Sequence, residues 1–132
     1  MKGRRKAAQS LVILGCLILA AGAGLHLAAA YPRVSAEVAA SNLNAGLQSA
    51  LRAVFLMIGW DWIVIAIVVL IAAFSETKLR KPVVVFLGAA LLVQAAVMLR
   101  LIGWFLGTDM ILTAGLLTLC GGLLFERPAL LP

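Results

Sequence analysis

The chain has 132 residues, of which 64% are hydrophobic and only 12% are charged, and its formal net charge is +6. Soluble domains are about half apolar and about a quarter charged, so this chain has too few polar side chains to cover a surface that faces water. The positive charge does not indicate a nucleic-acid-binding surface, because the basic residues cluster in short segments between long apolar runs. The composition therefore predicts an integral membrane protein that lies in the lipid bilayer and binds no nucleic acid.

Four apolar segments are candidates for membrane-spanning helices. We expect spans over residues 11–31, 51–74, 82–106 and 109–125. About 20 residues of α-helix cross a hydrocarbon core about 30 Å thick, and the last segment is near the lower limit of length. The spans should be helical because the edge of an open sheet cannot form its hydrogen bonds in lipid. The sequence thus predicts a single all-α domain over residues 1–132, built as an antiparallel bundle of four transmembrane helices.

The first span follows the basic sequence "MKGRRK", an arrangement that also occurs in cleaved signal peptides. Its apolar run is longer than the usual 7–15 residues of a signal peptide, and it contains His26. We therefore expect a retained membrane anchor. Pro32 should end this helix, because proline lacks a backbone N–H and its ring clashes with the preceding turn.

The segment 32–50 separates the first two spans, and its polar and apolar residues fall on opposite sides of a helix. The polar side holds Ser41, Asn44, Gln48 and Arg52, and the apolar side holds Leu43, Leu47, Ala50 and Val54. We expect an external amphipathic extension, in which the second helix begins near Ser41 and runs on into the second span. A separate interfacial helix from about Ser35 is the alternative.

Spans three and four are joined by the short sequence "FLGTD", which predicts a tight hairpin. Thr108 or Asp109 is suited to cap the fourth helix, and Pro128 follows its end. Small residues recur at every fourth position of the first and fourth spans, namely Ala20, Gly24, Ala28 and Ala114, Thr118, Gly122. Such stripes allow helix backbones to approach closely, either within one chain or between two chains.

The basic residues indicate the orientation in the membrane. With the N-terminus inside, most of the 11 Lys and Arg residues lie on the same side as the N-terminus: Lys2, Arg4, Arg5, Lys6, Lys78, Arg80, Lys81 and Arg127. Arg33, Arg52 and Arg100 lie on the other side. Because positive charge stays on the cytoplasmic side, we expect both termini in the cytoplasm. We expect a multi-pass protein of the bacterial inner membrane.

An acidic residue, Asp61, interrupts the apolar sequence "MIGWDWIVIA" of the second span. Helical periodicity places it on the same side as the apolar residues of the preceding extension, so we expect it to face the interior of the bundle. A charge near the centre of a span costs about 2.5–3.5 kcal/mol on insertion scales, and so a partner is expected. Arg100 is the leading candidate, and His26 lies at a similar depth. Tyr31 and Trp104 should form part of an aromatic belt at the membrane interface.

Asp61, Arg100 and His26 are therefore the predicted site, and several interpretations of it are open. Asp61 and Arg100 form a structural ion pair, or Arg100 reaches the outer head groups and leaves Asp61 protonated. Alternatively, the three residues line a pocket for a small ligand, a proton or a lipid head group, or the charges pair with another subunit.

No sequence motif indicates catalysis. One histidine and two distant cysteines do not make a conventional zinc site, and phosphate-binding, catalytic-triad and dinucleotide-binding patterns are absent. We therefore predict no catalytic residues, no metal and no cofactor. The expected function is that of a non-enzymatic accessory or scaffold subunit, which packs against other membrane proteins or against copies of itself. The alternatives are a small transporter or lipid-binding protein that uses the predicted site, and a membrane enzyme that acts on a lipid-soluble substrate.

Two short sequences resemble a known group of proteins. "GLHLAAAYP", at the end of the first span, and "LRAVFLMIGW", at the start of the second, are similar to the small bacterial four-helix membrane proteins grouped around the DoxX family. The resemblance covers the first two spans; it implies a four-helix bundle and often an accessory role beside another protein. The length and layout are also similar to those of small multidrug resistance transporters, but these use an acidic residue in the first helix, where this chain has only His26.

Overall fold

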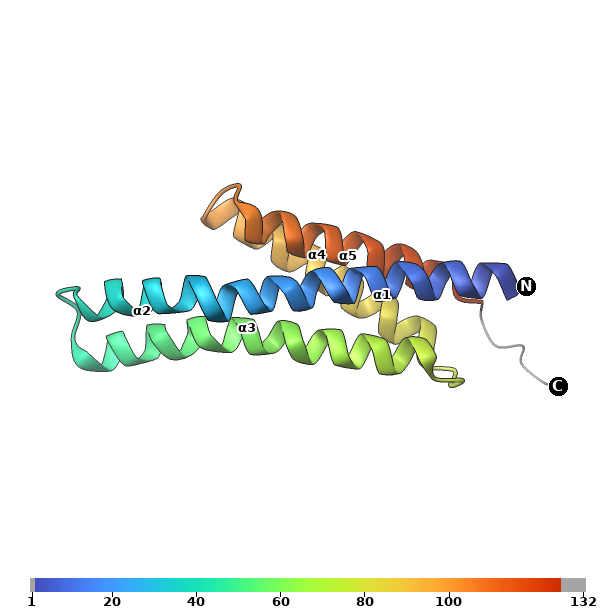
Figure 1. The fold of residues 1–132 in the computed structure, drawn as a ribbon, viewed down its shortest axis with the longest axis horizontal. Coiled ribbons are helices and arrows are strands. Elements are labelled where there is room, and N and C mark those ends of the chain that lie inside the picture. Colours follow the sequence, from blue (N-terminus) through green and yellow to red (C-terminus); the bar gives the residue numbers. More distant parts are fainter. Residues whose placement is uncertain (1, 127–132) are drawn as a thin grey trace.

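The computed structural model describes residues 2–126, which form helices joined by short loops (Figure 1). The elements are α1 (Lys2–Leu25), a π-helical turn (His26–Ala30), α2 (Tyr31–Ala39), α3 (Ala45–Phe74), α4 (Arg80–Leu101) and α5 (Leu106–Leu124). The all-helical prediction is confirmed for this part of the chain. The predicted roles of Arg127 and Pro128 fall outside the described residues.

Four helical stretches are long and apolar enough to cross a membrane. They are Gly3–Ala39, Ala45–Phe74, Arg80–Leu101 and Leu106–Leu124. Each contains a window with a mean hydropathy of at least 1.5, and a helix of this length satisfies its own backbone hydrogen bonds in lipid. Length and composition thus identify a multi-pass membrane protein.

The first helix does not end at Pro32, so that prediction was wrong. The chain passes from α1 through the π-helical turn directly into α2, and the Tyr31 N–H donates to the His26 carbonyl, five residues earlier. Pro32 then lies in the first turn of α2, where a missing N–H is tolerated. The wider turn comes immediately before the ring, at the place where a regular α-helix would press it against the preceding carbonyl.

The chain reverses at residues 40–44, and α3 then runs without interruption for 30 residues. Asn44 caps the helix, because its side-chain oxygen accepts a hydrogen bond from the Leu47 N–H at 2.9 Å. The prediction of one continuous helix from this segment through the second span is confirmed, although it begins at Ala45 rather than near Ser41. The alternative of a separate interfacial helix is replaced by α2, which continues the first helix.

The hairpin between α4 and α5 turns earlier than predicted. Gly103 has a backbone φ of +95°, a conformation that residues with a Cβ rarely adopt, and it allows the chain to reverse there. Because α5 already begins at Leu106, Thr108 and Asp109 lie inside its first turn, and neither is the capping residue. The Thr108 hydroxyl instead donates to the Gly103 carbonyl at 3.3 Å.

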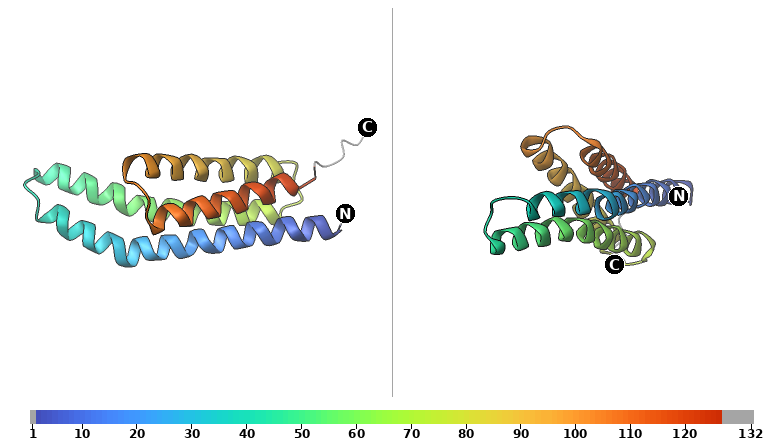
Figure 2. Two further views of the ribbon diagram at one scale, coloured as in Figure 1. Left: turned by 90° about the horizontal axis from the view of Figure 1, so that it is seen from above. Right: turned by 60° about the vertical axis from the view of Figure 1, so that its left-hand side comes forward.

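The helices do not pack equally against one another. α5 lies against both α1 and α4, α1 also lies against α3, and α3 and α4 share a smaller contact. α2 and the first part of α3 form a helical pair that extends beyond the α4–α5 hairpin, at the left of Figure 1. We call this pair, residues 31–54, the extension, and Figure 2 shows it from two further directions. α3 therefore has protein neighbours along only part of its circumference.

Small residues allow α5 to approach its two neighbours closely. A Cβ atom added at Gly88 of α4 would lie only 2.6 Å from the backbone nitrogen of Leu119 on α5. One added at Gly15 of α1 would lie 2.8 Å from Oγ1 of Thr118 and 3.0 Å from the carbonyl oxygen of Ala114. At both contacts the backbone of one helix touches the other helix directly, which maximises dispersion attraction without the need for a hydrophobic effect.

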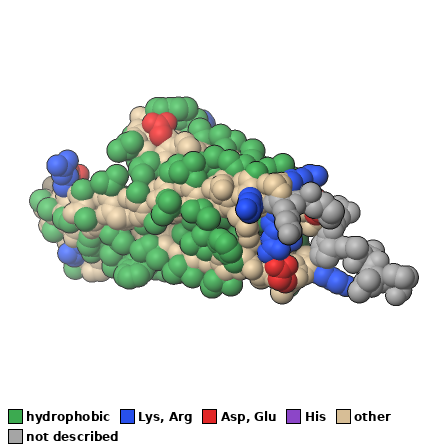
Figure 3. Space-filling model, turned by 45° about the vertical axis from the view of Figure 1, so that its right-hand side comes forward, with side chains coloured by type: hydrophobic (Ala, Val, Ile, Leu, Met, Phe, Trp, Pro, Cys, Tyr) green, Lys and Arg blue, Asp and Glu red, His purple; other side chains and the backbone are tan. Residues whose placement is uncertain are grey.

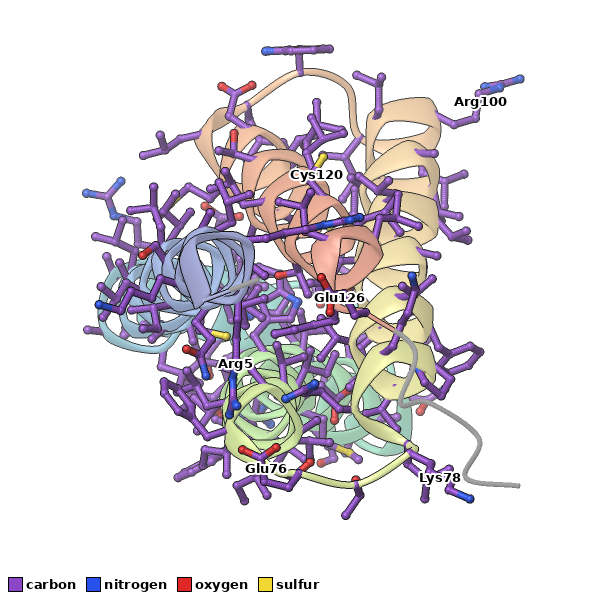
Figure 4. All side chains as sticks on the ribbon, turned by 90° about the vertical axis from the view of Figure 1, so that its right-hand side faces the viewer. Arg5, Glu76, Lys78, Arg100, Cys120 and Glu126 are labelled. Atoms are coloured by element: carbon purple, nitrogen blue, oxygen red, sulfur yellow. The ribbon has the colours of Figure 1, made fainter. Side chains whose placement is uncertain are left out.

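Charged side chains join the N-terminal part of α1 to the loop between α3 and α4. The Glu76 carboxylate accepts a hydrogen bond from Arg5 (Figure 4). Nη1 of Arg80 lies 3.9 Å from Oε2 of Glu76. Hydrogen bonding and attraction from Arg5 hold the pKa of Glu76 below its usual range, with a smaller contribution from Arg80. Because these groups are exposed to solvent, the pair adds little stability, but it fixes which ends of the helices lie together.

The contact at Gly88 yields a prediction for stability. Gly88→Ala should lower the free energy of unfolding by about 1–3 kcal/mol, because the added methyl group meets backbone atoms that cannot move away easily. The matched control is Gly24→Ala, where a Cβ atom would have no neighbour within 4 Å and the change should be neutral or slightly stabilising. Unfolding followed by circular dichroism in detergent micelles measures both. Equal stability of the two variants would contradict the close contact of α4 with α5.

Candidate functional site

Asp61 lies on the exposed side of α3, and the prediction that it faces the interior was wrong. The buried residues of α3 form a different stripe, made of Gly59, Trp62, Ala66, Val69 and Ala73. At about 100° per residue, Asp61 lies roughly 120° from the centre of this stripe. The carboxylate therefore points away from α1, the main neighbour of α3.

The error arose because the apolar side of the extension is its outer side. Leu47 and Val54 are 44% and 59% exposed, whereas Gln48 on the polar side is partly buried. The Gln48 side-chain N–H₂ donates to the carbonyls of Ser41 and Leu43, both at 3.1 Å. The polar side thus satisfies carbonyl groups of the turn at residues 40–44, which would otherwise lack partners. The prediction grouped the residues on the correct sides of the helix, but it assigned the apolar side to the interior of the protein and the polar side to the exterior, the reverse of the structure.

Arg100 does not approach Asp61. It lies in the last turn of α4, is exposed, and points away from the other helices in Figure 4. Within residues 2–126 the ion pairs involve Arg5, Glu76 and Arg80, and Asp61 forms neither an ion pair nor a side-chain hydrogen bond. The predicted pair of Asp61 and Arg100 is therefore not formed within the described chain.

The surroundings of Asp61 are apolar. Met57, Trp60 and Val64, which are one helical turn or less away, are 60%, 56% and 55% exposed. The space-filling view in Figure 3 shows that hydrophobic side chains cover much of the visible surface, while most visible charged side chains lie toward its ends. A carboxylate among these exposed apolar side chains of α3 is unusual, because charged groups in membrane-spanning helices are rare and costly. It marks this side of α3 as a candidate interaction site.

His26 lies between α1 and α3, apart from the other two predicted site residues. Its ring stacks on Phe55, with centroids 4.3 Å apart and an interplanar angle of 24°, and the Trp62 ring lies 5.2 Å away. Its Nε2 is 2.7 Å from the Phe55 carbonyl oxygen. Because a carbonyl only accepts, Nε2 is the protonated nitrogen, and in the neutral ring Nδ1 carries the lone pair. We call His26, Phe55 and Trp62 the aromatic cluster.

Two features distinguish the aromatic cluster from ordinary packing. His26 opens the π-helical turn, a distortion that often occurs at functional positions. The Trp62 side chain is only 2% exposed, yet its Nε1–H has no hydrogen-bond partner among the described residues. Buried donors are usually paired, and so this one is unusual. Sequence reasoning did not place Trp62 or Phe55 in the predicted site; their spacing of seven residues, two helical turns, was the available signal.

Of the two predicted stripes of small residues, the one on α5 is buried between helices and the one on α1 is exposed. Ala114, Thr118 and Gly122 are buried on α5, where Gly122 contacts Val84 and Val85 of α4. Ala20, Gly24 and Ala28 on α1 are all exposed. α1 packs through another set of residues, namely Ala8, Val12, Gly15, Cys16, Leu19, Gly22 and Ala23. Of the two predicted interface residues, Tyr31 is partly buried and Trp104 is exposed.

A shallow groove of about 180 Å³ lies between α1 and α3. Its walls are apolar: Ile13, Cys16, Leu17, Ala20, Ile63, Ala66, Ile67 and Leu70. None of Asp61, Arg100 and His26 lines it. The structure therefore does not bring the three predicted site residues into one pocket, and it does not place His26 and Asp61 as a hydrogen-bonded acid–base pair.

The aromatic cluster yields a prediction that separates its two contacts. His26→Phe keeps the stacked ring and removes the hydrogen bond, whereas His26→Gln keeps a donor and removes the ring. Each should lower the free energy of unfolding by about 0.5–1.5 kcal/mol, and His26→Ala should lower it by more than either. Thr113→Ala, at an exposed position of α5, is the control and should change it by less than about 0.5 kcal/mol. If His26→Ala behaves like this control in detergent unfolding, the cluster does not hold α1 to α3.

In comparisons with known proteins, no protein-family model, curated protein or solved structure matches the chain.

Proposed function

We propose that the protein is a non-enzymatic accessory or scaffold subunit that packs against other membrane protein in the bacterial inner membrane. The observation that carries this proposal is the position of Asp61, a carboxylate on the exposed side of an apolar helix with no partner in the described chain. It lies 13 residues before Phe74, so about 20 Å of helix separate it from that end of α3.

A lone chain would present this carboxylate to lipid. The cost is about 2.5–3.5 kcal/mol on insertion scales even after the side chain bends toward the interface. A neighbouring protein that donates hydrogen bonds to the carboxylate removes this penalty, and burial against protein strengthens those bonds relative to water. Asp61 is therefore energetically acceptable in this helix when a partner protein covers this side of α3.

Two further surfaces support a partner. The extension turns Leu43, Leu47 and Leu51 outward at 39–44% exposure, beyond the α4–α5 hairpin. The exposed small residues of α1, including Gly24, would allow another helix to approach its backbone closely. A contact that covered α3 and one of these surfaces would bury apolar area and satisfy Asp61 together.

For the arrangement in the membrane, we propose an antiparallel four-helix bundle with both termini in the cytoplasm. The contact of Arg5 with Glu76 supports this, because it brings the basic N-terminal sequence and the basic loop near Arg80 to one end of the molecule. Positive charge concentrated at one end favours the cytoplasmic side. The extension then projects from the outer side.

The orientation can be tested by labelling single cysteines in a variant in which Cys16 and Cys120 are replaced by alanine. A cysteine at Asn42, in the turn of the extension, should react with a membrane-impermeant maleimide applied to intact cells. One at Thr77, in the loop between α3 and α4, should react only after the membrane is opened. The reverse pattern would contradict the proposed orientation.

The accessory role can be tested by the assembly mass in mild detergent. The native chain should elute with a mass well above that of one 13.9 kDa chain in its micelle, and Asp61→Leu should reduce this mass to that of one chain. The melting temperature of the single chain should not fall, because Asp61 makes no polar contact with the other residues of 2–126. Glu126→Gln, at an exposed carboxylate just after α5, is the control and should leave the assembly intact. A native chain that is monomeric and by itself transports or converts a small molecule would overturn the proposal.

A further inference from the structure

We propose that the partner covering Asp61 is a second copy of the same chain, whose Arg100 pairs with this carboxylate. The inference rests on the proposed function and specifies its partner. It follows from three observations: the exposure of both charged side chains, their separation within one chain, and their positions along the helices.

The two charges are complementary and both lie open on the surface. Asp61 is exposed near the middle of α3, and Arg100 is exposed in the last turn of α4. Neither takes part in an ion pair among residues 2–126. Each copy therefore offers an exposed carboxylate on α3 and an exposed guanidinium on α4, and contact between copies neutralises both charges. A guanidinium is suited to this role because it binds a carboxylate through two parallel hydrogen bonds.

The fold prevents the pair from forming within one chain. α3 and α4 begin to diverge from their connecting loop, and α4 continues alongside α5 (Figures 1 and 2). Arg100 is at the far end of α4 from this loop and points outward in Figure 4. The carboxylate and the guanidinium thus lie on different outer surfaces. A contact between copies joins α3 of one to α4 of the next, which makes a head-to-tail assembly that closes into a ring or continues as a chain.

The positions along the helices are compatible with pairing. Measured from the loop between α3 and α4, Asp61 is about 20 Å along α3, and Arg100 is about 30 Å along α4, since it lies 20 residues beyond Arg80. α4 is inclined to α3 in Figure 1, which reduces the difference in height between copies that share one membrane plane. The long, flexible arginine side chain spans the remaining difference in height between the two residues.

Both charges are surrounded by large exposed apolar side chains. Met57, Trp60 and Val64 surround Asp61, and Val97 and Leu101 are adjacent to Arg100. When these groups meet, they exclude lipid and water from the ion pair, as the residues around a central polar contact do in other protein interfaces. The pair then has a low-dielectric environment, in which hydrogen bonds between charged groups are strong.

The test uses two full-length copies with different affinity tags, coexpressed and purified through one tag. The native copies should capture each other. With Asp61→Arg in both copies, or with Arg100→Asp in both, capture should fall at least tenfold, because like charges then meet. When one copy carries Asp61→Arg and the other Arg100→Asp, capture should return, since every contact in the mixed assembly again joins opposite charges. Lys78→Asp, a charge reversal at an exposed position of the loop between α3 and α4, is the matched control and should not affect capture.

A second measurement does not require reversed charges to be tolerated. In chains whose Cys16 and Cys120 are replaced by alanine, one copy carries Asp61→Cys and the other Arg100→Cys. Mild oxidation should produce a cross-linked dimer only when both copies are present. The native Asp61 of one copy can still pair with the native Arg100 of the other, so every second contact of the head-to-tail assembly stays intact.

The outcomes separate this inference from the function on which it rests. If native copies capture each other but the mixed charge reversal and the cysteine pair both fail, the assignment of Arg100 is wrong. If the native chain instead carries a different membrane protein, lost with Asp61→Leu, the second copy is ruled out as the partner and the accessory role stands. If the chain purifies alone and Asp61→Leu changes nothing, both proposals are wrong.

Discussion

The close approach of α5 to α1 and α4 determines how the rest of the chain is arranged. Gly15 and Gly88 let backbone atoms of neighbouring helices touch α5, and a larger residue at either position would push the helices apart. With α5 enclosed between two neighbours, α3 is left to contact mainly α1. α3 and α4 diverge from their connecting loop (Figures 1 and 2). The side of α3 that carries Asp61 is therefore outside, as a consequence of packing elsewhere in the molecule.

The existence of the helices could be predicted from sequence because it depends on hydropathy and length alone. Their ends were less predictable, since they depend on local backbone geometry. Pro32 ends a regular α-helix, but a preceding π-helical turn accommodates it. Gly103 turned the last hairpin earlier than the polar residues Thr108 and Asp109 indicated. In both cases the sequence pattern was consistent with two different backbone conformations.

The candidate site was less predictable than the fold. Periodicity gave the angle between Asp61 and the apolar side of the extension, but not which side of the helix faces protein. In the extension the polar residue Gln48 faces the turn because it donates to carbonyl groups there. Within the membrane, lipid is as apolar as a protein core, so hydropathy alone does not tell the side that faces protein from the side that faces lipid. The contact between His26 and Phe55 joins residues 29 positions apart, and it depends on how α1 lies against α3. No local pattern contains that information.

The π-helical turn also sets the direction in which α2 presents its side chains. Such a turn holds one residue more than the corresponding α-helical turn, so every residue beyond it is rotated by about 100° around the helix axis. α2 therefore meets α3 with a different set of side chains from the set that an unbroken helix of the same sequence would offer. Residues 26–30 thus determine which side of α2 faces α3. A homologue with one residue fewer in this turn would keep a continuous first helix, but the outer part of that helix would turn another side toward α3.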